Sequence, residues 1–205
     1  MKTLFFVLGL LLSCKPSKVK ITETDEPIST EETAVEEVYL EPVGVIPADD
    51  CQQIDIGDKA CNFRLADQNA DTWDLYSHSG DLIILDFSTV WCYPCQMAGY
   101  YAQSIQDDYS DDGVQFVTIL IDGATSGVEP TESEIDAWVS DHGITSAPIL
   151  QGSRTKMLDP AGVGIEGYLL GAFPTYIYIG RDMKFIGGHV GFSDEYVRQQ
   201  IEENL

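Results

Sequence analysis

The chain has 205 residues and a formal net charge of -23, from 34 acidic and 11 basic side chains. Its apolar fraction of 44% is that of a globular protein, and the length allows one domain of ordinary size with extensions. The charge excludes a nucleic-acid-binding protein, because there is no basic surface to neutralise phosphates. Such a charge either keeps a heavily solvated surface from aggregating or steers an electropositive partner toward it.

The first 14 residues have the features of an export signal. Lys2 gives a positive start, and Leu4–Leu12 is apolar but too short to span a bilayer. The stretch ends in the letters LLSC, which resemble the cleavage box of bacterial lipoproteins, so Cys14 is expected to become the acylated first residue of the mature chain. The alternative is an uncleaved anchor, or a secretory signal with an incidental cysteine. Lipid on Cys14 would hold the protein at a membrane, and Lys15 is compatible with the outer membrane.

Residues 15–50 are predicted to form a flexible acidic linker. After three lysines, glutamate and aspartate alternate with threonine, serine and proline. Few large apolar side chains occur, so the segment cannot offset the entropy lost on ordering, and its like charges extend it. We therefore expect a signal peptide with its lipobox at 1–14, a linker at 15–50 and a folded domain at 51–205.

The folded domain opens with elements of clear pattern. Residues 63–66 (FRLA) and 72–75 (TWDL), separated by a polar turn, predict a β-hairpin. The apolar run 82–87 (LIILDF) is typical of a strand buried on both faces. Apolar residues at intervals of four, from Met97 to Tyr109, predict one face of a helix over about 93–111 that ends at Gly113.

The rest of the domain alternates strands and helices. The expected elements are a core strand at 114–121, a helix from the capping box of Thr131 and Glu134 to Gly143, a short strand at 149–150, a hairpin of 175–179 and 184–187, and a helix capped by Ser193. The glycine-rich stretch 160–172 gives no clear assignment. This order predicts a mixed sheet covered on both faces.

The motif Cys92-x-x-Cys95 lies where the buried strand ends and the long helix begins. A thiol there faces unpaired backbone N–H groups and the positive end of the helix dipole, and both favour the thiolate that attacks disulfides. Pro94 suits the first helical turn, because the N–H that it lacks would have no partner. The motif predicts thiol–disulfide exchange, with Cys92 attacking and Cys95 resolving the mixed disulfide. An inert structural disulfide is the alternative.

This order of elements resembles the thioredoxin fold and, more narrowly, the membrane-anchored TlpA/ResA-type thioredoxins of the AhpC/TSA–redoxin superfamily. The segments that carry the resemblance are 56–65 (IGDKACNFRL), 85–95 (LDFSTVWCYPC) and 172–175 (AFPT). It covers about residues 54–205, with Cys61 where proline is usual and Ser88 where an aromatic residue is common. It implies an α/β, thioredoxin-like fold in which helices flank a central mixed sheet and a hairpin extends the N-terminal side.

The resemblance also implies roles for single residues. Asp86 has the spacing of the family's buried acid, whose pKa burial should raise, so that it relays a proton to or from Cys95. Phe173–Pro174 matches a cis-proline loop on which an extended substrate would add as a strand. A solvated Asp86 and a trans proline turn are the alternatives. The implied substrate-binding residues are Trp91, Tyr93, Pro94, Phe173 and Pro174.

The remaining cysteines of the domain, Cys51 and Cys61, are expected to pair as a structural disulfide that contributes about 2–3 kcal/mol in an oxidising compartment. Two free cysteines are the alternative. No metal or cofactor is expected, because Cys51 and Cys61 are too far apart in the sequence to complete a zinc site with a lone CxxC. His189 leaves open a copper site shared with Cys92 and Cys95, although an ordinary histidine is the simpler reading.

The leading hypothesis is an enzyme, a thiol–disulfide oxidoreductase on the periplasmic side of the bacterial cell envelope, lipid-anchored to a membrane. Its partners would be cysteine-containing exported proteins and a membrane electron donor or acceptor. By resemblance such proteins often act as reductants, but the sequence does not fix the direction. A non-catalytic copper-binding module is the alternative from another class. Peroxidase chemistry fits less well, since Leu85 stands where its motif needs proline.

Overall fold

The computed structural model describes residues 40–48, 51, 55–158, 167–168 and 170–205. The predicted signal peptide with Cys14, and most of the predicted linker, lie outside the described residues, as does much of the glycine-rich stretch. Within the described ranges, no helix has the length and apolar character needed to cross a membrane.

A five-stranded mixed sheet forms the centre of the domain, in the order β6-β5-β4-β7-β8. Its strands are β4 (Leu82–Thr89), β5 (Val114–Asp122), β6 (Ile149–Gln151), β7 (Thr175–Ile179) and β8 (Phe185–Val190). The three strands β4, β5 and β6 run parallel, and β7 and β8 are antiparallel additions. All residues of the central strand β4 are buried, which explains its continuous apolar run.

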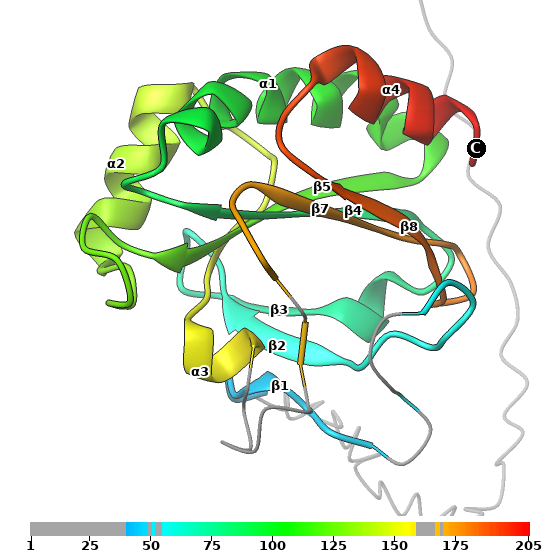
Figure 1. Ribbon diagram of the computed structural model, residues 1–205, viewed down its shortest axis with the longest axis horizontal. Helices are drawn as coiled ribbons and strands as arrows, with labels where there is room; N and C mark the ends of the chain where they lie inside the picture. The colour runs from blue at the N-terminus through cyan, green and yellow to red at the C-terminus, as the bar shows by residue number, and fades with distance from the viewer. Residues whose placement is uncertain (1–39, 49–50, 52–54, 159–166, 169) are drawn as a thin grey trace, which may run out of the picture. The chain divides into compact units, whose positions relative to one another are not determined.

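Three helices lie along one face of this sheet (Figure 1): α1 (Tyr93–Tyr109), α2 (Glu132–His142) and α4 (Asp194–Glu202). The predicted capping box of α2 is confirmed, because Thr131 and Glu134 each accept a hydrogen bond from the other's backbone N–H. Gly143 ends this helix in the left-handed region, and Ser193 caps α4. A short 3-10 turn, Ser110–Asp112, follows α1 before Gly113.

The opposite face is covered by a small antiparallel sheet and one short helix (Figure 1). The small sheet consists of β1 (Gly44–Val45), β2 (Phe63–Ala66) and β3 (Thr72–Asp74), which a 3-10 turn, Leu75–His78, follows; the helix is α3 (Arg154–Met157). The predicted hairpin of β2 and β3 is confirmed. Strand β1 lies inside the stretch expected to be linker, and α3 was not expected. Both are too short to leave a periodic pattern.

Two apolar layers separate on the two faces of β4. Ile83, Leu85 and Phe87 pack toward the small sheet, whereas Leu82 and Ile84 pack toward the helices. Successive side chains of a strand alternate between faces, so Asp86 lies on the helical side. That side also holds both cysteines of the CxxC motif.

The buried face of α1 differs from the apolar face expected at four-residue intervals. Met97 and Tyr101 are each 38% exposed, and only Ile105 of that series is fully buried. The helix instead turns small side chains toward the sheet, Ala98 and Ala102 among them. Small residues let the helix approach closely, and the larger ones are left at its margin.

Candidate redox site

Cys92 is the N-cap residue of α1, in extended conformation, and only Val90 and Trp91 separate it from the end of β4. Its Sγ accepts a hydrogen bond from the backbone N–H of Cys95 at 3.3 Å. Cys92 and Cys95 are joined as a disulfide, with Cys92 5% exposed and Cys95 fully buried. Pro94 lies in the first turn of the helix. The backbone N–H and the helix dipole both point at the outer sulfur, an arrangement that stabilises a thiolate there.

Asp86 is fully buried in β4. Burial raises the pKa of this carboxyl group to about 7, against the lowering effect of hydrogen bonds from two hydroxyl groups. Ser88 Oγ donates to one carboxylate oxygen at 2.7 Å, and Thr118 Oγ1 to the other at 3.5 Å. Near neutral pH this group can therefore both accept and donate a proton.

Ser88 is a further site residue, which the sequence marks only as a departure from the family pattern. It lies two residues after Asp86 on the same strand, so the two side chains share a face. That spacing was the available signal. The hydroxyl group takes the place of an aromatic ring and supplies the closest hydrogen bond to the buried acid.

The Phe173–Pro174 peptide bond is cis, as the resemblance predicts. The carbonyl oxygen of Phe173 lies 3.5 Å from Sγ of Cys92. Pro174 accepts a hydrogen bond from the N–H of Gly191, whereas the N–H and C=O of Phe173 make no backbone hydrogen bond within the described residues. An extended polypeptide could pair with this free edge next to the sulfur.

Two of the predicted substrate-binding side chains are exposed beside the nearly buried sulfur: Trp91 is 46% exposed and Tyr93 75%. The Trp91 ring meets the Phe173 ring edge to face at a centroid distance of 6.3 Å. Its indole N–H donates to Asp122 at 3.2 Å. These aromatic rings make an apolar rim around Cys92.

Asp122 and Arg154 form an ion pair that no local sequence pattern predicts. Arg154 Nε and Nη2 donate to the two carboxylate oxygens at 2.8 and 2.6 Å. Burial alone would raise the pKa of Asp122, but hydrogen bonds from Arg154, from the backbone of Gly127 and from Trp91 outweigh it, so the pKa lies below its usual value. The residues are 32 apart in sequence and meet only because α3 returns to the end of β5.

His189 lies in β8 and is surrounded by aromatic side chains. Its ring stacks on Tyr176 at 4.7 Å, and its Nδ1 lies 3.3 Å from the hydroxyl of Tyr178. Burial lowers its pKa, so the ring is neutral at neutral pH. Among the described residues, no three or more histidine, cysteine or carboxylate side chains come together to hold a metal, so His189 is not grouped with Cys92 and Cys95.

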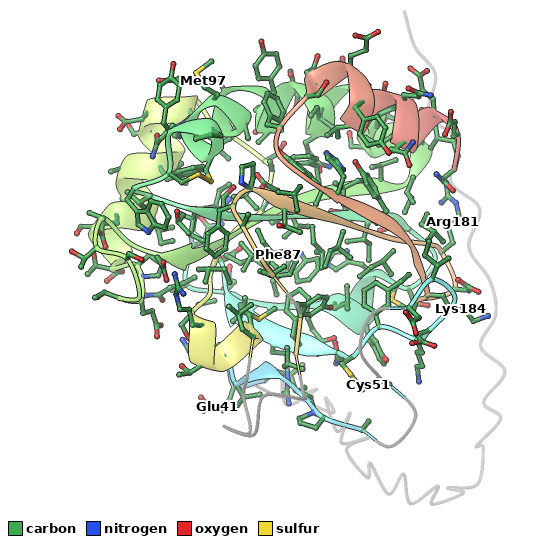
Figure 2. All side chains as sticks on the ribbon, in the orientation of Figure 1. Glu41, Cys51, Phe87, Met97, Arg181 and Lys184 are labelled. Carbon is green, nitrogen blue, oxygen red and sulfur yellow. A yellow bond between two sulfur atoms is a disulfide. The ribbon has the colours of Figure 1, made fainter. Side chains whose placement is uncertain are left out.

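The other cysteine pair lies on the opposite side of the sheet. Cys51 and Cys61 are joined as a disulfide with their Cα atoms 4.9 Å apart. Cys61 packs against the apolar layer that faces the small sheet. Figure 2 labels Cys51 at the edge of the molecule far from Met97, which lies on α1, the helix that Cys92 caps.

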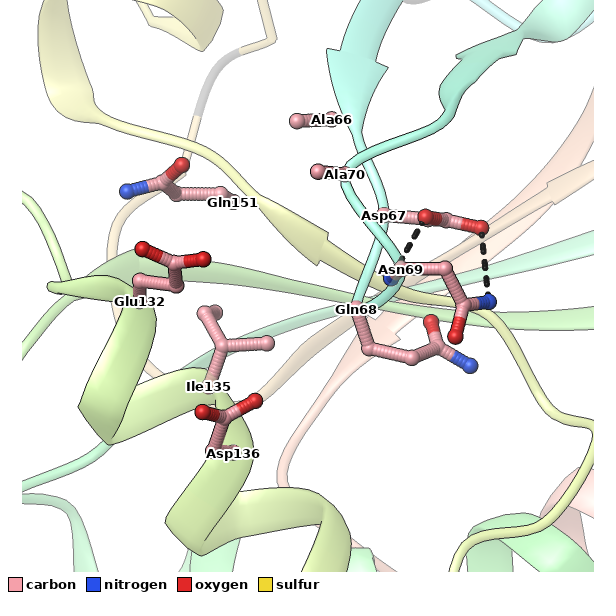
Figure 3. Close-up of a pocket in the computed structure, with 9 residues that line it drawn as sticks. All are labelled: Ala66, Asp67, Gln68, Asn69, Ala70, Glu132, Ile135, Asp136 and Gln151. Carbon is pink, nitrogen blue, oxygen red and sulfur yellow. Dashed lines mark hydrogen bonds between the residues drawn. The ribbon is translucent and has the colours of Figure 1, made fainter.

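A cavity of about 390 Å³ lies apart from the predicted site residues, between the β2–β3 turn and the start of α2 (Figure 3). Its lining residues are Ala66, Asp67, Gln68, Asn69, Ala70, Glu132, Ile135, Asp136 and Gln151. Asp67 is occupied in accepting the N–H groups of Asn69 and Asp71. None of the sequence-predicted site residues lines this cavity, so it is no part of the redox site.

Comparison with known proteins identifies the family. Residues 56–185 match the model of the AhpC/TSA family, which is more than half of the chain. The chain belongs to the AhpC/TSA family. The thiol–disulfide oxidoreductase ResA of Bacillus thuringiensis is 24% identical over 156 residues, covering 76% of this chain and 80% of ResA. ResA of Bacillus cereus is 25% identical over 156 residues, with the same coverage.

Solved structures confirm the predicted fold. A thiol:disulfide interchange protein of the DsbE type from Chlorobium tepidum superposes with a TM-score of 0.59 at 23% identity, covering 74% of this chain and 98% of its own. The exposed lipoprotein thioredoxin Etrx1 of Streptococcus pneumoniae gives 0.55 at 23% identity, covering 70% and 99%. The fold is thioredoxin-like. With the ResA relatives and the CxxC pair, the predicted class of enzyme, a thiol–disulfide oxidoreductase, is confirmed as well.

Proposed function

We propose that this oxidoreductase is lipid-anchored in the bacterial cell envelope and reduces disulfides of exported proteins through Cys92. The observation that carries the proposal is the position of Cys92. Its sulfur caps α1, accepts the Cys95 N–H and lies 3.5 Å from the carbonyl of the cis-proline loop. The nucleophilic sulfur of Cys92 therefore lies both at the positive end of the α1 dipole and beside the backbone edge on which a substrate can bind.

In the reduced protein the Cys92 thiolate attacks a substrate disulfide, so that a mixed disulfide forms and one substrate sulfur leaves as a thiolate. Cys95 then loses its proton and attacks Cys92 Sγ, which forms the Cys92–Cys95 bond and releases the second substrate sulfur. Two electrons pass to the substrate; one of its two protons comes from Cys95 and the other from water. An electron donor in the membrane must then return the pair to the dithiol form.

Asp86 would take the proton of Cys95 in the second step and pass it to the leaving sulfur. Its place on the helical side of β4, the side that holds Cys95, supports this role. A pKa of about 7 supports it further, because a carboxyl group with an ordinary pKa would be too weak a base to accept the proton of a thiol.

The direction of transfer is tested by the reduction potential of Cys92–Cys95. We would equilibrate the full-length protein in dithiothreitol or glutathione buffers and measure the fraction oxidised. A potential near that of thioredoxin, about −270 mV, is the expected result for a reductant. A potential near about −120 mV would overturn the proposed direction, since it belongs to proteins that introduce disulfides.

The anchor is proposed from Cys14 and its preceding residues. The similarity to a structure named as an exposed lipoprotein supports it. The wild-type protein should fractionate with membranes and should take up labelled palmitate. If Lys15 governs sorting, the membrane should be the outer one. A Cys14→Ser variant should do neither. Membrane association without palmitate label would show that an uncleaved signal, and not a lipid, anchors the protein.

A further inference from the structure

Four side chains form a connected cluster at the mouth of the redox site, and we call it the Arg154 cluster: Trp91, Asp122, Arg154 and Phe173. They come from the turn before α1, the end of β5, the start of α3 and the cis-proline loop. The fully buried carboxylate of Asp122 binds both the Trp91 indole and the Arg154 guanidinium. The guanidinium lies over the Phe173 ring at 5.9 Å from its centroid.

The contact with Asp122 holds Arg154 in place but does not occupy all of its hydrogen-bond donors. Its Nε and Nη2 form a two-pronged contact with Asp122, which fixes the plane of the guanidinium. Its side chain is still 45% exposed, and within the described part of the chain its Nη1 makes no hydrogen bond or ion pair. A charged hydrogen-bond donor with a fixed direction therefore faces solvent beside Phe173.

We propose that Arg154 is a substrate-positioning residue that donates from Nη1 to a main-chain carbonyl of an extended polypeptide lying along Phe173. This rests on the proposed function, because it assigns a binding contact to the same redox site. The Phe173 N–H and C=O are free of backbone hydrogen bonds within the described residues, and the carbonyl borders Cys92 Sγ. A chain that pairs there must pass the ring that the guanidinium covers.

Charge supports a main-chain oxygen as the ligand rather than a carboxylate group. The Arg154 charge is already balanced by Asp122, and the protein as a whole carries a net charge of -23. An acidic peptide would be repelled by the surface without gaining an unpaired cation. A neutral carbonyl group avoids that repulsion and still receives a charge-assisted hydrogen bond.

The contact predicts that polypeptide and small disulfides respond differently to loss of Arg154. A small disulfide such as bis(2-hydroxyethyl) disulfide reaches Cys92 without lying along Phe173, whereas insulin presents its disulfides on a polypeptide chain. In Arg154→Gln, kcat/KM for insulin should fall about tenfold, mostly through KM. The rate with the small disulfide should fall much less. Arg154→Lys should recover only part of the loss, because a lysine cannot keep the two-pronged contact and a free donor together.

Arg181→Gln is the matched control. Arg181 also binds protein carbonyls, those of Gly80 and Asp112, but these come before the starts of β4 and β5, whereas the redox pair comes after the end of β4. Arg181→Gln should change the rates with insulin and with the small disulfide to the same extent. The thermal midpoint of each variant reports folding, and if Arg154→Gln does not fold, the double variant Asp122→Asn, Arg154→Gln removes the uncompensated buried charge and is used instead.

Equal losses with both substrates would overturn the proposal and leave the Arg154 cluster a purely structural brace. An unchanged KM for insulin would overturn it too. Failure of the proposed function looks different, since the wild-type protein itself would then turn over neither insulin nor the small disulfide.

Discussion

Cys92–Cys95 and Cys51–Cys61 are the same covalent bond in two different settings, on opposite sides of one sheet. The first lies at a helix N-terminus, on the same face as a buried acid and next to an open backbone edge. The second joins a short loop beside the small sheet, and in the part of the chain that the structure describes no helix begins at either cysteine. We therefore attribute the proposed redox activity of Cys92–Cys95 to the surroundings of its sulfur atoms rather than to the disulfide itself.

Replacement of Cys92 or Cys95 should have the largest effect on activity and so distinguish this pair most clearly from Cys51–Cys61. Cys92→Ser should reduce insulin only at the uncatalysed background rate, because serine supplies no thiolate. Cys95→Ser should accumulate mixed disulfides, which a non-reducing gel would show, because nothing resolves them. Insulin reduction by the Cys92→Ser protein above background would refute the assigned nucleophile.

Removal of the buried acid should have the next largest effect. Asp86→Asn should slow insulin reduction about ten- to a hundredfold, because no base takes the proton of Cys95. The wild-type rate should rise with pH through about 7, where the carboxyl group ionises, and the variant should lack this rise. A pH profile that survives the substitution unchanged would assign the rise to another group.

The same substitution should stabilise the fold at high pH. The pKa of Asp86 is raised above its unfolded value, so the folded state holds a proton that the unfolded state releases between about pH 4 and pH 7. Wild-type stability should therefore fall as the pH rises through this window. Asp86→Asn should be the more stable protein at pH 8, by at most on the order of 4 kcal/mol, and should gain little at pH 4. Urea unfolding at both pH values measures the difference, and no pH dependence of the gain would contradict a raised pKa.

Removal of Cys51–Cys61, the pair proposed to be structural, should lower stability but leave activity unchanged. The double variant Cys51→Ser, Cys61→Ser should lose about 2–3 kcal/mol of unfolding free energy, because the unfolded chain regains the entropy of an open ten-residue loop. Its insulin-reduction rate at 25 °C should match the wild type. Urea unfolding and the insulin assay, run side by side, check both halves. A large loss of activity in a folded variant would show that the two pairs communicate.

The CxxC part of the redox site was predictable because its residues are neighbours in the sequence, whereas the roles of Asp86 and Phe173–Pro174 came from the family resemblance. The strand run before Cys92, the proline after it and the helix period all fall within about 30 residues. Arg154 and Asp122 were missed because their contact depends on α3, a single helical turn too short to be periodic. Strand β1 was missed for the same reason. Tertiary contacts made by such short elements leave no local pattern to read.

Substitution of Ser88 offers the smallest and most specific test of the comparison, because it changes the surroundings of the redox pair without replacing a cysteine or Asp86. Its hydrogen bond lowers the pKa of Asp86 against the effect of burial, so Ser88→Ala should raise that pKa further. The pH at which insulin reduction reaches half its maximum should move upward, and the rate at pH 7 should fall within about fivefold.

Ser88→Thr is the matched control, since it keeps the hydroxyl group and suits a strand. The pH profile of insulin reduction by Ser88→Thr should match that of the wild type. If the alanine and threonine variants shift together, packing around Ser88 rather than its hydrogen bond sets the rate. A shift in alanine alone would show that one hydroxyl group on the shared face of β4 helps to set the proton affinity of Asp86, a setting that Cys51–Cys61 lacks.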